Sequence, residues 1–186
     1  MLLKGKKITF GITGSLYAIK KVIPQIHMLK NEGADIIPIM SVNYYGDKLE
    51  ILKQITDITE EKMLCNIQDV EEKLNKNDID IMIIAPCSGN HIAKLANGII
   101  DTAVLKAAEK TLKNEKNIVI GIATLEGLGI EAKNIGKLLN MKKIFFIPFR
   151  QDNPITKPHS LMYSNKHILE TTIKALKEEQ IQPILV

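Results

Sequence analysis

Five short apolar segments recur along the chain and predict the strands of one sheet. Each is almost continuous in Ile, Val and Phe character, which is typical of strands covered on both faces. Between the segments, apolar residues at spacings of three and four predict amphipathic helices. Strands that alternate with helices and short turns indicate an α/β fold with a Rossmann-like, doubly wound parallel sheet. The predicted strands cover residues 8–13, 36–41, 81–85, 118–123 and 144–148.

Three features refine this pattern. Leu16, Ile19, Ile23 and Ile26 have helical spacing and predict one helix after the first strand. It is expected to end at residues 31–33, where Gly33 suits a helix C-terminus. Pro38 lies inside the second apolar segment and predicts an edge strand or an early strand end, because proline lacks a backbone donor. The more polar residues 43–76 predict one or two helices, with Asp69 and Glu72 spaced like a capping box.

The chain changes character after the fifth predicted strand. Residues 149–160 are polar and contain two prolines, so we expect a loop there. A helix over 163–179 and a tail over 181–186 follow. Since there is no internal repeat, linker or low-complexity segment, a single domain is expected over residues 1–186.

Composition narrows the possible partners. The sequence is 45% hydrophobic and 25% charged, and its net charge of +4 comes from scattered lysines with a single arginine, Arg150. A solvated surface is favoured over nucleic-acid binding, which needs a clustered basic face. No apolar run approaches the roughly 18 to 20 residues that span a bilayer, and no cleavable leader is visible. We therefore expect a cytoplasmic protein without a membrane contact.

The two cysteines and four histidines give little sign of a metal site. Cys65 and Cys87 are too few for a disulfide framework and lack the spacing of metal ligands, so both are expected to be reduced, and no metal is predicted. His27, His91 and His167 lie on predicted helices or at a helix start, where structural or surface roles are favoured.

The first predicted strand ends in Thr13-Gly14-Ser15 and leads directly into a helix. Ligands of open parallel sheets gather at the carboxyl ends of the strands. Hydroxyl groups, a glycine and backbone N–H groups suit an oxyanion such as a phosphate. In the alternative interpretation, Gly14 only permits a tight turn and Ser15 only caps the helix.

The third predicted strand stops at Pro86 and is followed by Cys87-Ser88-Gly89-Asn90. This turn also presents backbone N–H groups and polar side chains at the carboxyl edge of the sheet. Cys87 could act as a nucleophile, but no base accompanies it in the sequence, and packing is the favoured role.

These two strand ends resemble the signatures of the flavoprotein family that includes homo-oligomeric flavin-containing cysteine decarboxylases and flavin prenyltransferases. Residues 11–15 are similar to its Gly-x-Thr-Gly-Ser turn, and residues 85–101 to its Ala-Pro-x-(Ser/Thr)-x-Asn turn and following helix. The resemblance implies an FMN site. It implies a phosphate beside Thr13, Gly14 and Ser15, and a flavin ring beside Ser41, Pro86, Ser88, Asn90 and Thr124.

One signature departs from the decarboxylases. Their fourth strand ends in a Pro-x-Met-Asn motif that contacts substrate, whereas residues 123–129 here read Ala-Thr-Leu-Glu-Gly-Leu-Gly. Cysteine decarboxylation is therefore disfavoured. A flavin prenyltransferase remains an alternative that depends on fold resemblance alone.

Further segments resemble the family of dipicolinate synthase B subunits over residues 4–186, most weakly over 43–76. This resemblance implies an oxidoreductase component that forms pyridine-2,6-dicarboxylate from a dihydrodipicolinate-type precursor in the mother cell of a sporulating bacterium. It implies a partner, the A subunit of dipicolinate synthase, which would carry NAD(P), and self-association into a homo-oligomer. The segments are residues 4–6, 24–26, 31–35, 94–97, 145–149, 151–154, 157–158 and 182–186.

The predicted loop after the fifth strand offers groups for a dicarboxylate. Arg150 can pair with a carboxylate in a bidentate manner, Lys157 adds a point charge, and Ser160 adds a hydroxyl. An imidazole is suited to accept a proton, so His159 is the predicted catalytic base. The alternative is that these side chains are merely solvated. A second function also stays open, in which the chain keeps the fold, binds no cofactor and stabilises the partner chain.

Overall fold

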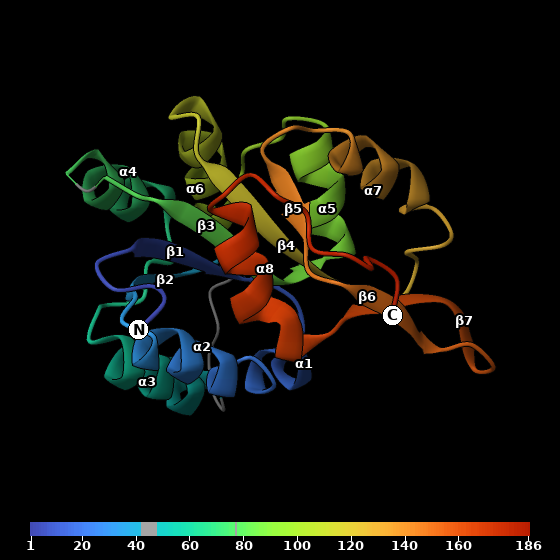
Figure 1. The fold of residues 1–186 in the computed structure, drawn as a ribbon, viewed down its shortest axis with the longest axis horizontal. Coiled ribbons are helices and arrows are strands. Elements are labelled where there is room, and N and C mark those ends of the chain that lie inside the picture. Colours follow the sequence, from blue (N-terminus) through green and yellow to red (C-terminus); the bar gives the residue numbers. More distant parts are fainter. Residues whose placement is uncertain (42–47, 77) are drawn as a thin grey trace.

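The computed structural model describes residues 1–41, 48–76 and 78–186. Within these ranges the strands form one seven-stranded sheet of order β2-β1-β3-β4-β7-β6, with β5 also paired to β4 (Figure 1). The pairs among β1 to β5 are parallel, which confirms the doubly wound prediction. The strands are β1 (Lys7–Ile12), β2 (Asp35–Met40), β3 (Ile81–Ser88), β4 (Asn117–Thr124), β5 (Ile144–Phe146), β6 (Phe149–Asn153) and β7 (Lys157–Tyr163).

Helices cover both faces of the sheet. Helix α6 packs on β1, β3 and β4 beside α4 and α5, and α7 packs on α5 and β5. Helix α8 packs on β4 and β5 next to α2 and lies in front of the sheet in Figure 1. The helices are α1 (Leu16–Lys20), α2 (Ile23–Asn31), α3 (Lys48–Thr59), α4 (Ile67–Asn75), α5 (Gly89–Ala96), α6 (Ala103–Lys113), α7 (Ala132–Leu139) and α8 (Ile168–Ala175), the last preceded by a 3-10 turn (Asn165–His167).

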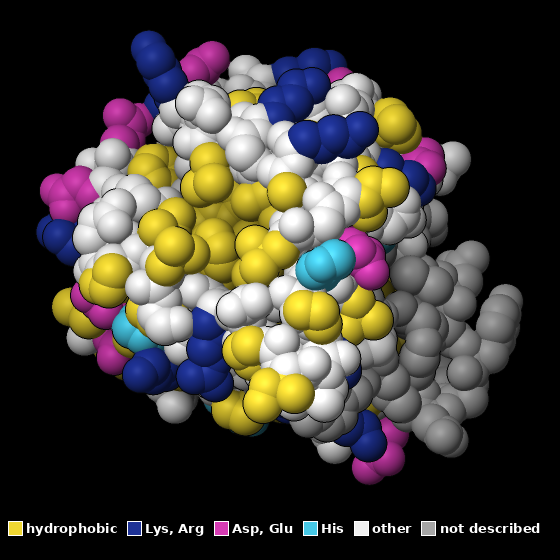
Figure 2. All heavy atoms as spheres, turned by 90° about the vertical axis from the view of Figure 1, so that its right-hand side faces the viewer, with side chains coloured by type: hydrophobic (Ala, Val, Ile, Leu, Met, Phe, Trp, Pro, Cys, Tyr) yellow, Lys and Arg dark blue, Asp and Glu magenta, His cyan; other side chains and the backbone are white. Residues whose placement is uncertain are grey.

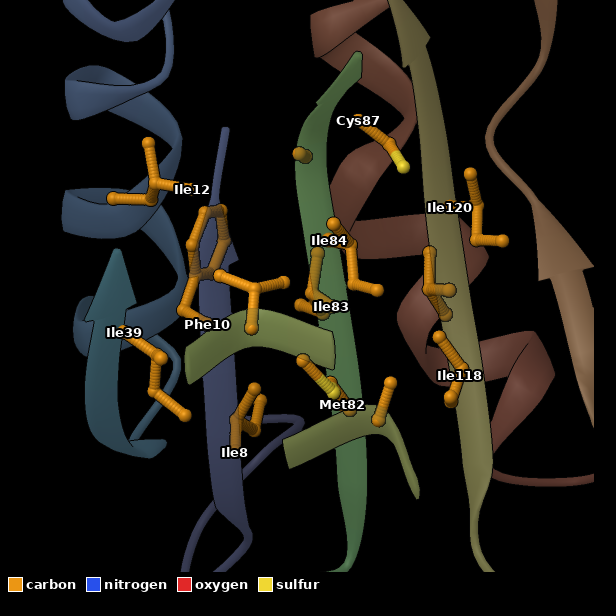
Figure 3. Packing of buried hydrophobic residues seen from close by; sticks show 14 of the residues in the cluster. Ile8, Phe10, Ile12, Ile39, Met82, Ile83, Ile84, Cys87, Ile118 and Ile120 are labelled. Atoms are coloured by element: carbon orange, nitrogen blue, oxygen red, sulfur yellow. The ribbon is translucent and has the colours of Figure 1, made fainter. Parts of the chain in front are cut away.

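The central strands are buried on both faces, as their continuous apolar sequences predict. Phe10 on β1 and Ile83 on β3 lie side by side in the sheet and are both fully buried. Figure 3 shows aliphatic side chains from adjacent strands packing in rows across the sheet. This rigid core holds the carboxyl ends of the central strands in a fixed register.

The second strand lies at the edge of the sheet, as Pro38 predicts. Pro38 has no N–H to donate, and its carbonyl accepts from the Leu64 N–H at 3.0 Å. The third strand differs from the prediction. It does not stop at Pro86 but continues to Ser88 across a register shift between Ile84 and Cys87.

The segment predicted as a loop over 149–160 is instead an antiparallel hairpin. Strand β6 pairs with β7, and β7 pairs with the end of β4 through Ala123 and Thr124. The turn between them is closed by the Asn153 side chain, which accepts from the Ile155 and Thr156 N–H groups. The sequence does not predict this hairpin, because the segment contains prolines and exposed polar residues. An edge hairpin with one solvated face needs few apolar side chains.

Three helix predictions also need correction. The helix expected from Leu16 to residues 31–33 is two helices, because α2 starts again at Ile23 with a proline in its first turn; its predicted end is confirmed, since α2 ends at Asn31. The final helix begins at Ile168, since Tyr163 still belongs to β7. The N-cap of α4 is Asn66, which accepts from the Asp69 N–H at 2.8 Å, so the capping pair lies three residues before the predicted one.

None of the helices in the described ranges combines the length and the apolar character needed for a bilayer span. In the same ranges, no three His, Cys, Asp or Glu side chains gather closely enough to hold a metal ion. Cys65 and Cys87 are free.

Candidate functional site

The carboxyl ends of four strands meet at one edge of the sheet. In the parallel register Ile12 lies beside Met40, Gly11 beside Ile84, and Ser88 beside Ala123. The chain leaves β1 and β3 in opposite directions, so their ends form the topological switch point where open α/β sheets bind ligands. Both turns with family signatures therefore lie at the position that this fold favours for a ligand.

Thr13 joins the two turns directly. Its hydroxyl donates to the Pro86 carbonyl at 2.9 Å and accepts from the Ser88 N–H at 2.8 Å, and its own N–H also donates to the Pro86 carbonyl. The Thr13 side chain is fully buried. Thr13 therefore positions the site. Its hydroxyl is used by Pro86 and Ser88, whereas the sequence predicts that it faces a phosphate.

Gly14 has a φ of +97°, a conformation that favours glycine. A Cβ atom at this position would lie 3.9 Å from Pro86 Cγ and 4.0 Å from Ser88 Cβ, so the first turn touches the second. Ser15 is exposed and caps α1, with its hydroxyl accepting from the Ala18 N–H. Ser15 therefore caps α1, and its exposed position also leaves it accessible to a ligand.

The N-terminus of α5 completes this edge. Ser88 is the N-cap residue, and Asn90 is exposed in the first turn. Gly89 lies so close to β4 that an added Cβ atom would be 2.6 Å from Thr124 Oγ1. Thr124 accepts from the Glu126 N–H, which fixes the loop after β4. Ser88, Asn90 and Thr124 therefore lie at the same edge of the sheet, and their contact with a flavin ring stays a prediction.

His91, for which the sequence predicts a structural or surface role, also lies at this edge. His91 is 6% exposed; its Nδ1 lies 2.9 Å from Ser88 Oγ and its Nε2 lies 3.5 Å from Thr102 Oγ1. Burial and the nearby Lys94 charge lower the pKa of His91 to about 4, against a smaller raising effect of Asp101. The spacing of Ser88 and His91, N-cap to third helical position, is the sequence signal that could have revealed this contact.

A polar pocket of about 380 Å³ opens beside this network, between the end of β2 and the N-termini of α4 and α6. Ser41 lies in its wall, and the Ser41 hydroxyl oxygen is buried without a hydrogen-bond partner among the described residues. Thr102 lines the same pocket and caps α6. An orphaned hydroxyl of this kind indicates a missing polar partner.

A second hollow lies between the hairpin and the loop that follows β4. Lys157 and His159 line it together with Leu125 and Glu126. His159 Nδ1 lies 3.7 Å from the Glu126 carboxylate, and Lys157 Nζ is 3.6 Å from Asp152. The structure thus brings the predicted catalytic base, His159, together with one of the three predicted substrate-binding residues, Lys157.

The other two predicted substrate-binding residues, Arg150 and Ser160, lie outside this hollow. Arg150 is exposed on β6 and is not part of the lining of the hollow. Ser160 is 1% exposed on β7, so it does not reach the hollow either. The alternating direction of side chains along a strand separates Ser160 from its neighbour His159.

Cys87 is not a nucleophile in this structure. Its side chain is fully buried, and burial together with the Glu131 charge raises the pKa of its thiol far above the ordinary value. The packing role is the one that the structure supports.

The profile of the flavoprotein family matches residues 2–177, which is most of the chain. The chain belongs to the flavoprotein family. Within the flavoprotein family it belongs to the group of dipicolinate synthase B subunits. It is 42% identical over 190 aligned residues to the dipicolinate synthase B subunit of Bacillus subtilis (strain 168), covering 99% of this chain and 95% of that protein.

Solved structures agree with this placement of the flavoprotein. The crystal structure of the dipicolinate synthase B subunit from Bacillus halodurans C has a TM-score of 0.94 at 38% identity, covering 100% of this chain and 98% of that one. The FMN-dependent cysteine decarboxylase SpaF has a TM-score of 0.65 at 17% identity, covering 94% and 99%. The second likeness shows that the flavoprotein shares the fold of these decarboxylases.

Proposed function

We propose that this flavoprotein acts with the dipicolinate synthase A subunit to form dipicolinate from a dihydrodipicolinate-type precursor during sporulation. The identity to the Bacillus subtilis protein, which extends over nearly the whole of both chains, supports this role. The observation that carries the proposal of a ligand site is the Thr13–Ser88 hydrogen bond, which holds both signature turns at one edge.

The residues at this edge fit FMN. Gly14 and Ser15 would hold the phosphate, and Ser41, Pro86, Ser88, Asn90 and Thr124 would surround the ring. The orphaned Ser41 hydroxyl supports the fit, because a ligand polar group would satisfy it. A bound flavin supplies a hydride acceptor. NAD(P), if the reaction uses it, would be held by the partner chain.

Formation of the aromatic ring removes a hydride equivalent and a proton from the precursor, and aromaticity helps to drive it. In the proposed site Lys157 binds one carboxylate of the substrate and His159 accepts the proton, with Glu126 orienting its ring. Arg150, on the neighbouring strand, would need the partner or a second copy of the chain to complete a carboxylate site.

A hydrophobic face supports contact with other chains. Figure 2 shows a hollowed area of hydrophobic side chains on the side where β6, β7 and α7 lie. Such a face is typical of a protein–protein contact. We infer from it, and from the resemblance, a homo-oligomer of single-domain chains that binds its partner in the mother-cell cytoplasm. The exposed apolar residues of α7, of the loops beside β4 and β6, and of the C-terminal tail are Leu125, Leu128, Ile130, Leu139, Ile155, Leu185 and Val186.

Reconstitution with the A-type partner chain tests the function. The pair is expected to convert the precursor to dipicolinate, followed by ultraviolet absorbance, faster than the partner does by itself. Ser15→Asp and Asn90→Ala are expected to remove this gain while the two chains still co-purify.

The second candidate is a scaffold that stabilises the partner chain without a cofactor. It is favoured by the absence of a Pro-x-Met-Asn sequence at residues 123–129. A scaffold would tolerate both substitutions with full activity of the pair. Prenyl transfer by the isolated chain would instead indicate the prenyltransferase alternative.

A further inference from the structure

An apolar groove of about 420 Å³ lies on the helical layer formed by α5, α6 and α7. In Figure 1 α5 lies between the other two helices, and it packs against both. Ile99 and Ile100, in the loop between α5 and α6, are 49% and 38% exposed. The apolar side chains that line the groove belong to Leu95, Ile99, Ile100, Leu105, Leu112 and Met141. Such exposed apolar side chains favour a contact that removes them from water.

The α6 side of the groove is electrically balanced. Glu109 lines the groove, and its carboxylate lies 2.5 Å from Lys113 Nζ and 3.0 Å from Lys106 Nζ. Hydrogen bonds from Lys113 and Lys106 hold the pKa of Glu109 below its ordinary value, so the carboxylate is ionised. Lys106 also pairs with Glu71 at 2.9 Å. Two ammonium groups therefore match two carboxylates on this side.

The α7 side of the groove is basic. Lys137 lines the groove, and Lys133 lies one helical turn before it on the same face of α7. Both side chains are exposed, and Lys137 Nζ donates to the Asn97 side-chain oxygen at 3.4 Å. Within the described part of the chain neither lysine forms an ion pair. The groove thus combines an apolar floor with two ammonium groups that can each take a carboxylate.

The same charges disfavour a second copy of the chain as the occupant. If the groove lay on a twofold axis, Lys137 of one copy would face Lys137 of the other, and like charges oppose such a contact. The groove also shares no residue with the hydrophobic face from which self-association is inferred above. A segment of a different protein, with apolar and acidic side chains, matches both the floor and the basic edge.

We propose that this groove receives an amphipathic helix of the partner chain, with aliphatic side chains on the floor and carboxylates beside Lys133 and Lys137. A groove between helices accepts the ridge of another helix, whose apolar anchors recur every three or four residues. Acidic residues four positions apart on that helix match the spacing of the two lysines. The name of the partner rests on the proposed function, whereas the chemistry of the occupant rests on the groove.

A model peptide tests the groove without the partner. NMR of labelled methionine methyl groups reports on Met141, and Met141→Leu identifies its signal among the seven methionines. A helical peptide with leucine on one face and glutamate along the flanks should shift this signal with saturation. The same peptide with lysine in place of glutamate should bind about tenfold more weakly, because attraction to two exposed lysines becomes repulsion. Equal affinities, or no shift with either peptide, would overturn the proposal.

Binding of the purified dipicolinate synthase A subunit tests the partner. Lys137→Glu and Ile99→Ser should each raise the dissociation constant of the pair about tenfold, and the effect of Lys137→Glu should shrink at high salt. Lys4→Glu and Leu2→Ser are matched controls at exposed positions near the N-terminus, and both should bind like wild type. Thermal melts check that each variant is folded.

The outcomes separate this proposal from the proposed function. If the wild-type chain does not bind the A subunit, the proposed function fails, and the peptide experiment still decides what the groove accepts. If Lys137→Glu and Ile99→Ser bind the A subunit like wild type, the proposal is overturned while the proposed function stands. Light scattering completes the test, since a loss of self-association in these two variants would identify a second copy as the occupant and overturn the proposal.

Discussion

The Thr13 hydroxyl accepts a hydrogen bond from the Ser88 N–H at 2.8 Å, across 75 positions of the sequence. This contact lies between the ends of β1 and β3, at the switch point of the sheet. The contact joins into one site two turns that are far apart in the sequence. Because Thr13 is fully buried, the bond is shielded from water and its loss has a cost in stability.

Thr13→Val is expected to lower the free energy of unfolding by about 1–3 kcal/mol, because it leaves the Ser88 N–H without an acceptor. Urea denaturation followed by circular dichroism measures this. Thr13→Ser, which keeps the hydroxyl, is the matched control and should lose less. Equal losses in both variants would show that the hydroxyl contact contributes nothing.

Gly89→Ala is expected to destabilise the protein by about 1–3 kcal/mol through overpacking, because its Cβ atom would meet Thr124 Oγ1 at 2.6 Å and Glu131 Cγ at 3.2 Å. Gly136→Ala on α7 is the control. No atom lies within 4 Å of its added Cβ, so it should stabilise the helix by about 0.5–1 kcal/mol. Thermal denaturation of both variants distinguishes crowding at Gly89 from a general effect of glycine replacement.

Asp80 gives the stability of the protein a pH dependence. Its carboxylate accepts from Lys6 Nζ and from the Lys7 N–H, each at 2.9 Å. Burial raises the pKa of Asp80, but the hydrogen bonds from Lys6 and Lys7 outweigh this and hold it below its ordinary value.

A lowered folded-state pKa stabilises the protein above the unfolded value of about 3.9, and this contribution is lost as the pH falls through the folded pKa. Asp80→Asn should therefore be less stable than wild type at pH 6, with the difference shrinking below pH 4. Asp78→Asn, whose side chain is 88% exposed, should differ little at either pH. A constant difference for Asp80→Asn across this range would contradict the assignment.

Cys87 is expected to resist thiol reagents in the folded protein, because its thiol is fully buried and its pKa is raised. Cys65 is only half-buried and should react, slowly, since burial and then Asp69 also raise its pKa. Counting modified thiols in buffer and then in urea checks this. Reaction of Cys87 at the rate of Cys65 in buffer would show that the strand end opens.

The sequence predicts the central sheet well because strands buried on both faces must be apolar throughout. The Ser88–Asn90 turn and the Thr13–Ser15 turn are also found from the sequence, since strand ends of a parallel sheet share one edge. The hairpin of β6 and β7 is missed, because its outward face is solvated and its pairing depends on β4, a partner far away in the sequence.

The roles of single side chains depend on contacts that no local pattern encodes. Thr13 was predicted to bind phosphate, but its hydroxyl is used by Pro86 and Ser88. The sequence predicts a structural or surface role for His91, and its contact with Thr102 arises only when α6 packs against α5. Tertiary packing decides which polar groups remain available to a ligand.

Titration of the pure chain with FMN, followed by quenching of flavin fluorescence, tests the central claim most directly. Wild type and Ser15→Asn should bind with saturation, since asparagine also caps a helix. Ser15→Asp keeps the cap but places a negative charge beside the phosphate, and should bind at least tenfold more weakly. No saturable binding by wild type, or equal affinity of the Asp and Asn variants, would contradict a flavin phosphate at Gly14 and Ser15.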